Sequence, residues 1–317
     1  MWKLTVFVTA LVFSLPAAAW HDTGHRATAY IAYERMDAGM RHEVATVLAA
    51  HPRYAQDFGA AMPAGIAAGD ASARGRWLLA QASVWPDMAR DFPQADRERY
   101  DRGTWHYVNE IVWLRDEDRE ALDGSLPHNL TREPDGPPAP GMNSVQALRA
   151  NLVVWHDPAS SDGDRAVALC WILHITGDMH QPLHNTALFS RSLFSSGDRG
   201  GNLVIVERGR NDSNLHAVWD GLVNEHDDLE PDADTAHAIA TDIVDDGAID
   251  RWVDSHANLA KLVVYNGELV AQLVAAEQSG KAARVTLSDD YLERARRVGQ
   301  RQVILAGHRI AQLLDPH

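Results

Sequence analysis

The segment HITGDMHQPLH, residues 174–184, carries the strongest local signal in the sequence. It sets His174, Asp178 and His184 in the pattern H-x3-D-x5-H. On a helix, residues four apart share a face, so His174 and Asp178 are predicted to lie side by side. Pro182 then ends the helix, which lets His184 turn back toward them. Imidazole together with carboxylate suits Zn²⁺, so the segment predicts a zinc site at a helix end.

A second pair with the same spacing, His216 and Asp220, occurs in NLHAVWD, residues 214–220. A lone histidine on an apolar helix is usually an ordinary core residue. However, both aspartates lie in apolar surroundings, where a carboxylate is costly unless it is paired or coordinated. Two such pairs therefore favour metal coordination. The only cysteine, Cys170, cannot build a thiolate site or an internal disulfide and is predicted to be a buried apolar residue.

Other catalytic motifs are missing or weak. The sequence contains no H-E-x-x-H, no G-x-S-x-G, no P-loop and no E-x-x-H pair. The dipeptide His156-Asp157 is found in histidine-aspartate phosphohydrolases, but here it precedes Pro158 at a predicted helix end, where a solvated cap is the better interpretation.

Amphipathic helical patterns dominate the chain, so the predicted fold is mainly α. Turn-rich stretches at 62–70, 132–142 and 190–202 separate these patterns, and LVIVE at 203–207 predicts a short strand. Because the polar motifs lie on both sides of the proline-rich stretch, we predict one domain, 20–317, with long loops and at most a short β-hairpin. The predicted helices are 24–36, 38–50, 143–156, 164–180, 214–225, 235–245, 250–277 and 288–315.

The first 19 residues resemble a secretory signal peptide. Lys3 supplies a positive charge, LTVFVTALVF an apolar core, and Ala17 to Ala19 a cleavage site before Trp20. We therefore expect a periplasmic or secreted protein that begins at Trp20, with no later membrane-spanning segment. The net charge of −15 argues against nucleic-acid binding through a basic surface, so an anionic substrate would need a local positive centre.

Further short motifs stand in a fixed order between residues 20 and 220. They are W-x4-H (Trp20 and His25), WPD (Asp87), WHYVN (His106), HITGDMHQPLH, DRGGN (Asn202) and NLHAVWD. The series resembles the zinc-dependent single-strand-specific nucleases, the plant and fungal nuclease I type of the phospholipase C/nuclease superfamily. Phospholipase C typically carries H-x3-E in the last pair, so Asp220 favours the nuclease.

The resemblance implies a helical fold and three zinc ions per chain. One zinc would be held by Asp87, His106, His174 and Asp178. A second would be held by Trp20, through its free α-amine and carbonyl oxygen, with His25 and the bridging Asp178. A third would be held by His184, His216 and Asp220.

The resemblance also implies roles around the metals. Arg90 matches a basic residue that stabilises the transition state, with an exposed surface arginine as the alternative. Tyr107 matches an aromatic residue that stacks on a base, with plain packing as the alternative. Asn109 stands where fungal members carry a base-binding aspartate, and Asn202 is either a substrate contact or a turn former.

The function implied is a monomeric, exported trizinc phosphodiesterase that cleaves single-stranded DNA and RNA to 5′-mononucleotides, with 3′-nucleotidase activity. Asp87, Arg90 and Asp178 would be its catalytic residues. Two alternatives remain open: a zinc-dependent phospholipase C, and a noncatalytic zinc-binding protein whose metals would have closed coordination shells.

Overall fold

The structure is a computed structural model that describes residues 20–122, 129–209, 211–224, 227, 229–242, 244–245 and 247–315. The expected signal peptide, residues 1–19, lies outside the described residues. Among those that are described, no single helix has the length and apolar character needed to cross a membrane, and one bent pair, Ala248–Val264 with Gly267–Gln278, meets both requirements jointly.

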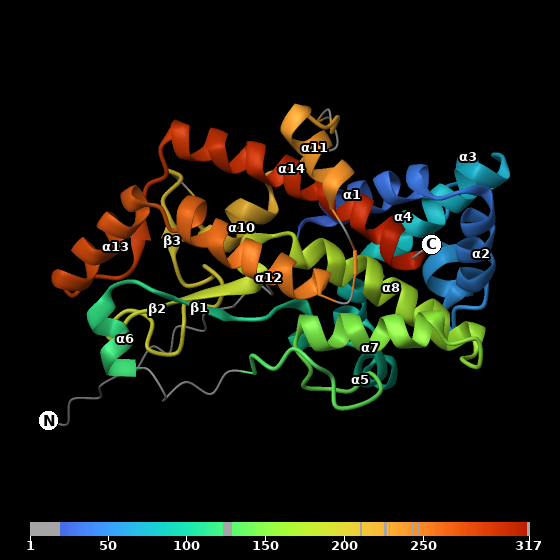
Figure 1. The fold of residues 1–317 in the computed structure, drawn as a ribbon, viewed down its shortest axis with the longest axis horizontal. Helices are drawn as coiled ribbons and strands as arrows, with labels where there is room; N and C mark the ends of the chain where they lie inside the picture. Colours follow the sequence, from blue (N-terminus) through green and yellow to red (C-terminus); the bar gives the residue numbers. More distant parts are fainter. Residues whose placement is uncertain are drawn as a thin grey trace, which may run out of the picture.

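The mainly α, single-domain fold is confirmed, and most predicted helices are found within a few residues of their expected ends. Helix α8 (Asp162–Met179) runs through the middle, and α1, α2, α4, α7 and α14 pack around it (Figure 1). Residues 168–179 of α8 are all buried, which explains why this stretch shows no polar face. The other predicted helices are α1 (Asp22–Arg35), α2 (Ala38–Ala49), α7 (Ser144–His156), α10 (Leu215–Asp220), α11 (Ala233–Thr241) and α14 (Asp289–Leu314).

Helix α4 (Ala71–Met88) was missed in the sequence, although it carries Asp87. It contains Gly75 and Pro86, and both residue types oppose a helix interior. The Asp70 side chain caps the helix by accepting a hydrogen bond from Ala73 N, and the buried second half of the helix packs on α8. Packing therefore overrides local propensity here. The short helices α3 (Ala64–Ala67), α5 (Gln94–Tyr100), α6 (Asp116–Leu122) and α9 (Pro182–Asn185) were missed as well.

The single helix predicted at 250–277 is wrong, because the chain breaks it into α12 (Ala248–Leu259) and α13 (Gly267–Gln278). A π-helical turn, η4 (Ala260–Val264), follows α12. Asn266 then caps α13 by accepting a hydrogen bond from Leu269 N. Asparagine is a preferred N-cap residue, so Asn266 marks the start of α13. The continuous apolar periodicity of 250–277 led us to predict a single helix instead.

The β structure extends beyond the short hairpin that we expected. Strand β1 (Glu110–Trp113) pairs in parallel with β2 (Thr186–Phe189). Strand β3 (Ile205–Val206), within the predicted 203–207, pairs with β4 (Ser213–Asn214) antiparallel and with β5 (Arg284–Val285) parallel. The β1–β2 pair places the chain after His106 beside the chain after His184.

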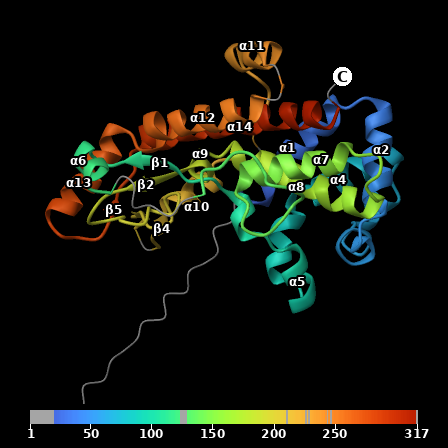
Figure 2. The same cartoon turned by 60° about the horizontal axis from the view of Figure 1, so that its bottom comes forward.

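The molecule has two apolar clusters, and the segment 174–184 passes from one to the other. Ile175 and Met179 belong to a cluster built around α8, which includes Trp85 and Trp171. Leu183 belongs to a second cluster, which includes Trp20, Trp219 and Tyr265. Figure 2 shows α11 standing out from α14, away from the layer that contains α8. The polar motifs therefore meet where the two clusters join.

Candidate metal centre

The segment that carries the metal motif folds as two helices with a tight turn between them. Helix α8 ends at Met179, and Pro182 takes the first position of α9, where a missing N–H costs nothing. The Gln181 side chain caps α9 by accepting a hydrogen bond from Leu183 N. The expected return of His184 is thus achieved by a new helical turn.

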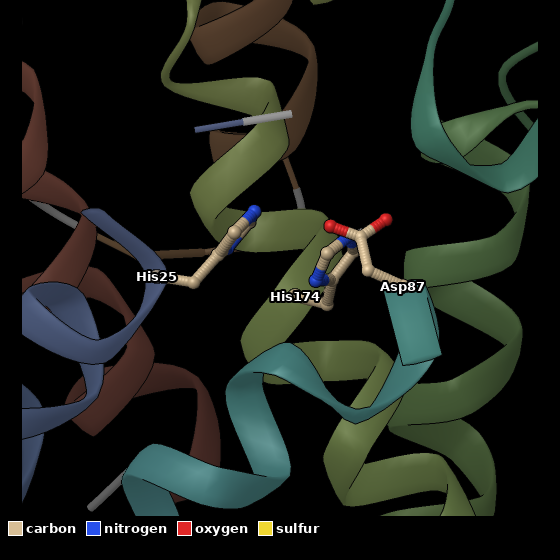
Figure 3. A group of neighbouring side chains, drawn as sticks. All are labelled: His25, Asp87 and His174. Carbon is tan, nitrogen blue, oxygen red and sulfur yellow. The ribbon is translucent and has the colours of Figure 1, made fainter. Parts of the chain in front are cut away.

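Three groups of side chains bring potential metal ligands within 4.8 Å of one another. His25 from α1, Asp87 from α4 and His174 from α8 form the first group, and Figure 3 shows the three side chains directed toward one another. His106 joins His174 and Asp178 in the second group, and the third group consists of His184, His216 and Asp220.

Asp178 links the first two groups. Its carboxylate is fully buried, and Oδ1 lies 3.2 Å from His25 Nε2. The other oxygen, Oδ2, lies 3.0 Å from His106 Nδ1 and 3.3 Å from His174 Nε2. Asp87 Oδ1 approaches the same histidines, at 3.7 Å from His174 Nε2 and 3.9 Å from His106 Nδ1.

Backbone carbonyl groups set the orientation of several imidazole rings. The Nδ1 atom of His174 donates to Ser83 O at 2.8 Å, that of His184 to His106 O at 2.6 Å, and that of His216 to Gly200 O at 2.7 Å. Each ring therefore keeps its proton on Nδ1 and presents an unprotonated Nε2, as metal-binding histidines require.

The resulting arrangement leaves lone pairs facing lone pairs. His184 Nε2 and His216 Nε2 lie 3.1 Å apart, and His25 Nε2, Asp87 Oδ1 and Asp178 Oδ1 are buried without a hydrogen-bond partner among the described residues. Buried polar groups without partners are costly, and a shared cation removes that cost. The donor set of neutral imidazole and carboxylate fits a divalent metal such as zinc.

Burial shapes the titration of these ligands. Desolvation lowers the pKa of His25 and of His216 to about 4, and lowers the pKa of His106, His174 and His184 as well. The same loss of solvent raises the pKa of Asp178 and of Asp220 well above the usual range. In the absence of a cation, these side chains therefore face one another mainly as neutral groups rather than as ion pairs.

Trp20 lies fully buried beside the first group, and its indole Nε1 donates to Gly177 O at 3.0 Å. Gly177 is essential to this approach, because a Cβ there would lie 2.7 Å from His25 Nδ1. The segment that leads into α1 is therefore held against α8, next to Asp178.

Positioning residues surround the ligands. Gln181 Nε2 donates to Asp220 Oδ1 at 2.8 Å, and Arg90 Nη2 forms an ion pair with Asp87 Oδ1 at 2.7 Å. Arg90, which was predicted, also lies 3.4 Å from His106 Nε2. Gln181 lies within HITGDMHQPLH, so the motif contained it. The roles of Ser83 and Gly200 could not be predicted from the sequence, because their backbone carbonyl groups contact the histidines and not their side chains.

A pocket of about 220 Å³ is lined by residues on both sides of His106 in the sequence. Tyr107, 38% exposed, and Asn109 contribute to its wall, but Asn202 is not among the lining residues. Asn202 instead donates its side-chain N–H to Arg199 O, the bond expected of a turn former. The remaining lining residues, which the sequence did not indicate, are Thr104, Val108, Asn129, Gly141, Met142 and Asn143.

Comparison with known proteins finds plant endonucleases with similar sequences. Endonuclease 1 of Arabidopsis thaliana is 23% identical over 309 residues, covering 94% of this chain and 86% of that protein. Endonuclease 5 of the same plant is 46% identical over 56 residues, and Endonuclease 4 is 43% identical over 58 residues. Each of these shorter matches covers 18% of this chain, and they span 16% and 17% of the two endonucleases. A family model described as S1/P1 Nuclease matches residues 20–317, and the chain therefore belongs to the S1/P1 nuclease family.

Proposed function

We propose that this nuclease is an exported trizinc phosphodiesterase that cleaves single-stranded DNA and RNA to 5′-mononucleotides and also acts as a 3′-nucleotidase. The observation that carries the proposal is the presence of three histidine and aspartate groups, largely buried, whose potential ligand atoms lie within 4.8 Å of one another. Family membership supports nucleic acid as the substrate.

Three ligand sets account for the geometry. The first would consist of Asp87, His106, His174 and Asp178, which come from the first two of the three groups, and the third would consist of His184, His216 and Asp220. The second set combines Asp178 with His25 and with the α-amine and carbonyl oxygen of Trp20, which would become its ligands after cleavage behind Ala19 in the periplasm or outside the cell. Zinc held there would polarise a phosphate and make a water acidic enough to act as the nucleophile near neutral pH.

The side chains at the rim would then bind and orient the substrate. Arg90 is held by Asp87 close to His106, from where its guanidinium can stabilise negative charge that develops on the phosphate. Tyr107 offers an exposed ring for a base to stack on, and Asn109 offers an amide to the base edge. Asn202 would contribute through the turn that it closes.

Single-strand preference follows from the stacking contact. A duplex must extrude a base at a cost of a few kcal/mol before the base can reach Tyr107, whereas a single strand offers its bases freely. Stacking is worth about 1 to 3 kcal/mol per base. Discrimination of about a hundredfold is expected from an energy of roughly 3 kcal/mol.

The test incubates the zinc-loaded monomer with single-stranded DNA, duplex DNA, RNA and phosphatidylcholine vesicles, after elemental analysis of its zinc. We expect about three zinc ions per chain and cleavage of both single-stranded substrates to 5′-phosphorylated products. Tyr107→Ala should raise KM for single strands about tenfold with little change in kcat, whereas Tyr30→Ala, outside the pocket, should change neither constant. Release of phosphocholine alone would identify a phospholipase C, and bound zinc without any hydrolysis would identify a noncatalytic zinc protein.

A further inference from the structure

Arg199, in the loop between β2 and β3, adopts an unfavourable backbone conformation. Its φ of 57° lies in the left-handed region, and no other residue except glycine does so in the part of the chain that the structure describes. A side chain with a Cβ pays a steric cost there that glycine does not. Such strain persists where the surroundings impose it, and it is found often at functional sites.

Hydrogen bonds and close packing around Arg199 hold its backbone in this left-handed conformation. The buried Asp198 accepts hydrogen bonds from Leu188 N and from the Tyr265 hydroxyl group, while Arg199 O accepts two from Asn202. Gly200, the next residue, packs so closely on Leu183 O that a Cβ would overlap it. The carbonyl of Gly200 is also the acceptor that orients His216. Arg199 is therefore attached directly to the backbone that supports the third ligand group.

Among the residues that the structure describes, none pairs with the charge of Arg199. Its side chain is exposed, and its guanidinium makes no ion pair or hydrogen bond with the described residues. Arg90, by contrast, is paired with Asp87. In a chain with a net charge of −15, an exposed cation whose backbone adjoins the third ligand group, and which no described residue neutralises, is suited to an anion.

We infer that Arg199 binds a phosphate of the substrate strand that flanks the scissile phosphate, an inference that rests on the proposed function. The scissile phosphate would be opposed by the ligand groups and by Arg90. The long side chain of Arg199 begins next to Gly200, whose carbonyl orients His216 of the third group. It would extend the positive charge along the bound nucleic-acid strand, toward the next phosphodiester. Arg199 is thus a specificity residue that favours chains of several nucleotides over the shortest substrates.

The experiment compares Arg199→Asn, which removes the charge and tolerates the left-handed backbone, with the zinc-loaded unmodified protein. The substrates are decathymidylate and a thymidine dinucleoside monophosphate, which carries only the scissile phosphate. For decathymidylate we expect KM to rise three- to tenfold at low salt. The slope of log(kcat/KM) against log[salt] should become shallower by about 0.7, the share of one phosphate contact on a single strand. The dinucleoside monophosphate should be cleaved as before.

Two control variants sharpen the result. Arg191→Asn removes an equal charge from an exposed position of the same loop and should leave both substrates unaffected, and Arg199→Lys should keep the salt slope. Relief of backbone strain should raise the melting temperature of Arg199→Asn by about 2 °C. An unchanged slope, an equal loss on both substrates, or the same effect from Arg191→Asn would overturn the inference while the proposed function stands. Failure of the unmodified protein to cleave either oligonucleotide would overturn both.

Discussion

Asp178 is the residue on which the first two ligand groups depend. Its two carboxylate oxygens face three different imidazole rings, and neither oxygen has access to solvent. Asp178→Asn keeps the shape but replaces one oxygen with an N–H donor, which cannot bind a cation. We expect loss of one or two zinc ions and a fall in kcat of at least about a hundredfold, larger than the usual loss for a residue that only supports a ligand.

Zinc analysis and single-strand cleavage, measured side by side, test this expectation. The control is Asp91→Asn, an exposed carboxylate four residues from Asp87, which should retain both zinc and turnover. A variant at Asp178 with normal zinc content and normal turnover would remove the bridging role.

Gly177 allows α1 and α8 to approach each other at the metal centre. A methyl group at this position would lie 2.7 Å from His25 Nδ1, and His25 is fully buried with no room to retreat. Gly177→Ala should therefore displace His25, lower the zinc content and destabilise the protein by about 1 to 3 kcal/mol, as overpacking usually does. Gly267→Ala, where no atom lies within 4 Å of the new Cβ, is the matched control in denaturant unfolding. Equal stability and zinc content in the two variants would show that His25 can adapt.

At the scale of elements, the end of α8 is anchored to two other helices through a buried polar network. His180 donates from Nδ1 to Thr176 O, and its Nε2 accepts from Arg309 Nη1 at 2.7 Å. Arg309, on α14, also donates to Asp242, which follows α11, at 2.6 Å. Because burial lowers the pKa of Arg309, its charge is held at a cost that these partners offset.

Loss of Arg309 should therefore loosen the helix that presents Asp178. Arg309→Met leaves the partly buried carboxylate of Asp242 without its cation and the buried His180 Nε2 without its donor, and we expect a loss of about 2 to 3 kcal/mol in the free energy of unfolding. Arg297→Met, on the same helix, breaks only the exposed pair with Glu293 and should cost less than about 1 kcal/mol. If urea unfolding gives similar values for both, the network does not hold α8 in place.

The elements also show what the sequence could and could not predict. The spacing of His174 and Asp178 places both on one face of a helix, and this local relation was correct. His25, Asp87 and His174 come together from three different helices, and no spacing along the chain predicts this contact. The resemblance to a family placed Asp87 and His174 in one ligand set and His25 in another, linked through Asp178. Strands β1 and β2 pair across more than seventy residues, and β2 is buried on all sides, so it lacks the alternation that reveals a strand.

At the scale of the whole molecule, an acidic chain places its polyanion-binding chemistry at the junction of two apolar clusters. The candidate ligands come from α1, α4, α8, α9 and α10 together with the turn that contains His106, so the three candidate groups form only when these elements are assembled. Such a site couples metal binding to folding. The same assembly buries several histidines that contribute no candidate ligand, and these make stability dependent on pH.

Burial lowers the pKa of His51 and of His256 to about 4 from an unfolded value of 6.5. The folded state therefore binds their protons less readily than the unfolded state does. The contribution of each histidine to stability is complete above pH 6.5 and is lost as the pH falls toward about 4. Each histidine should lower the free energy of unfolding by about 2 kcal/mol between pH 7 and pH 5. The chelated protein should lose more stability over this range, because His25 and His216 then titrate in the same window.

Chelated protein is the appropriate material, because acid would otherwise strip zinc and mix two effects. His256 Nδ1 donates to Trp252 O, and Nε2 lies 2.8 Å from Gln302 Oε1, so His256→Gln keeps a polar group while it removes the titration. The free energy of unfolding of this variant should fall between pH 7 and pH 5 by about 2 kcal/mol less than that of the chelated unmodified protein. His237→Gln, at an exposed position of α11, should leave the pH dependence unchanged. Parallel pH profiles for the His256 variant and the unmodified protein would mean that water reaches His256 in the folded state, and the acid sensitivity would then have to come from His51 and the ligand groups.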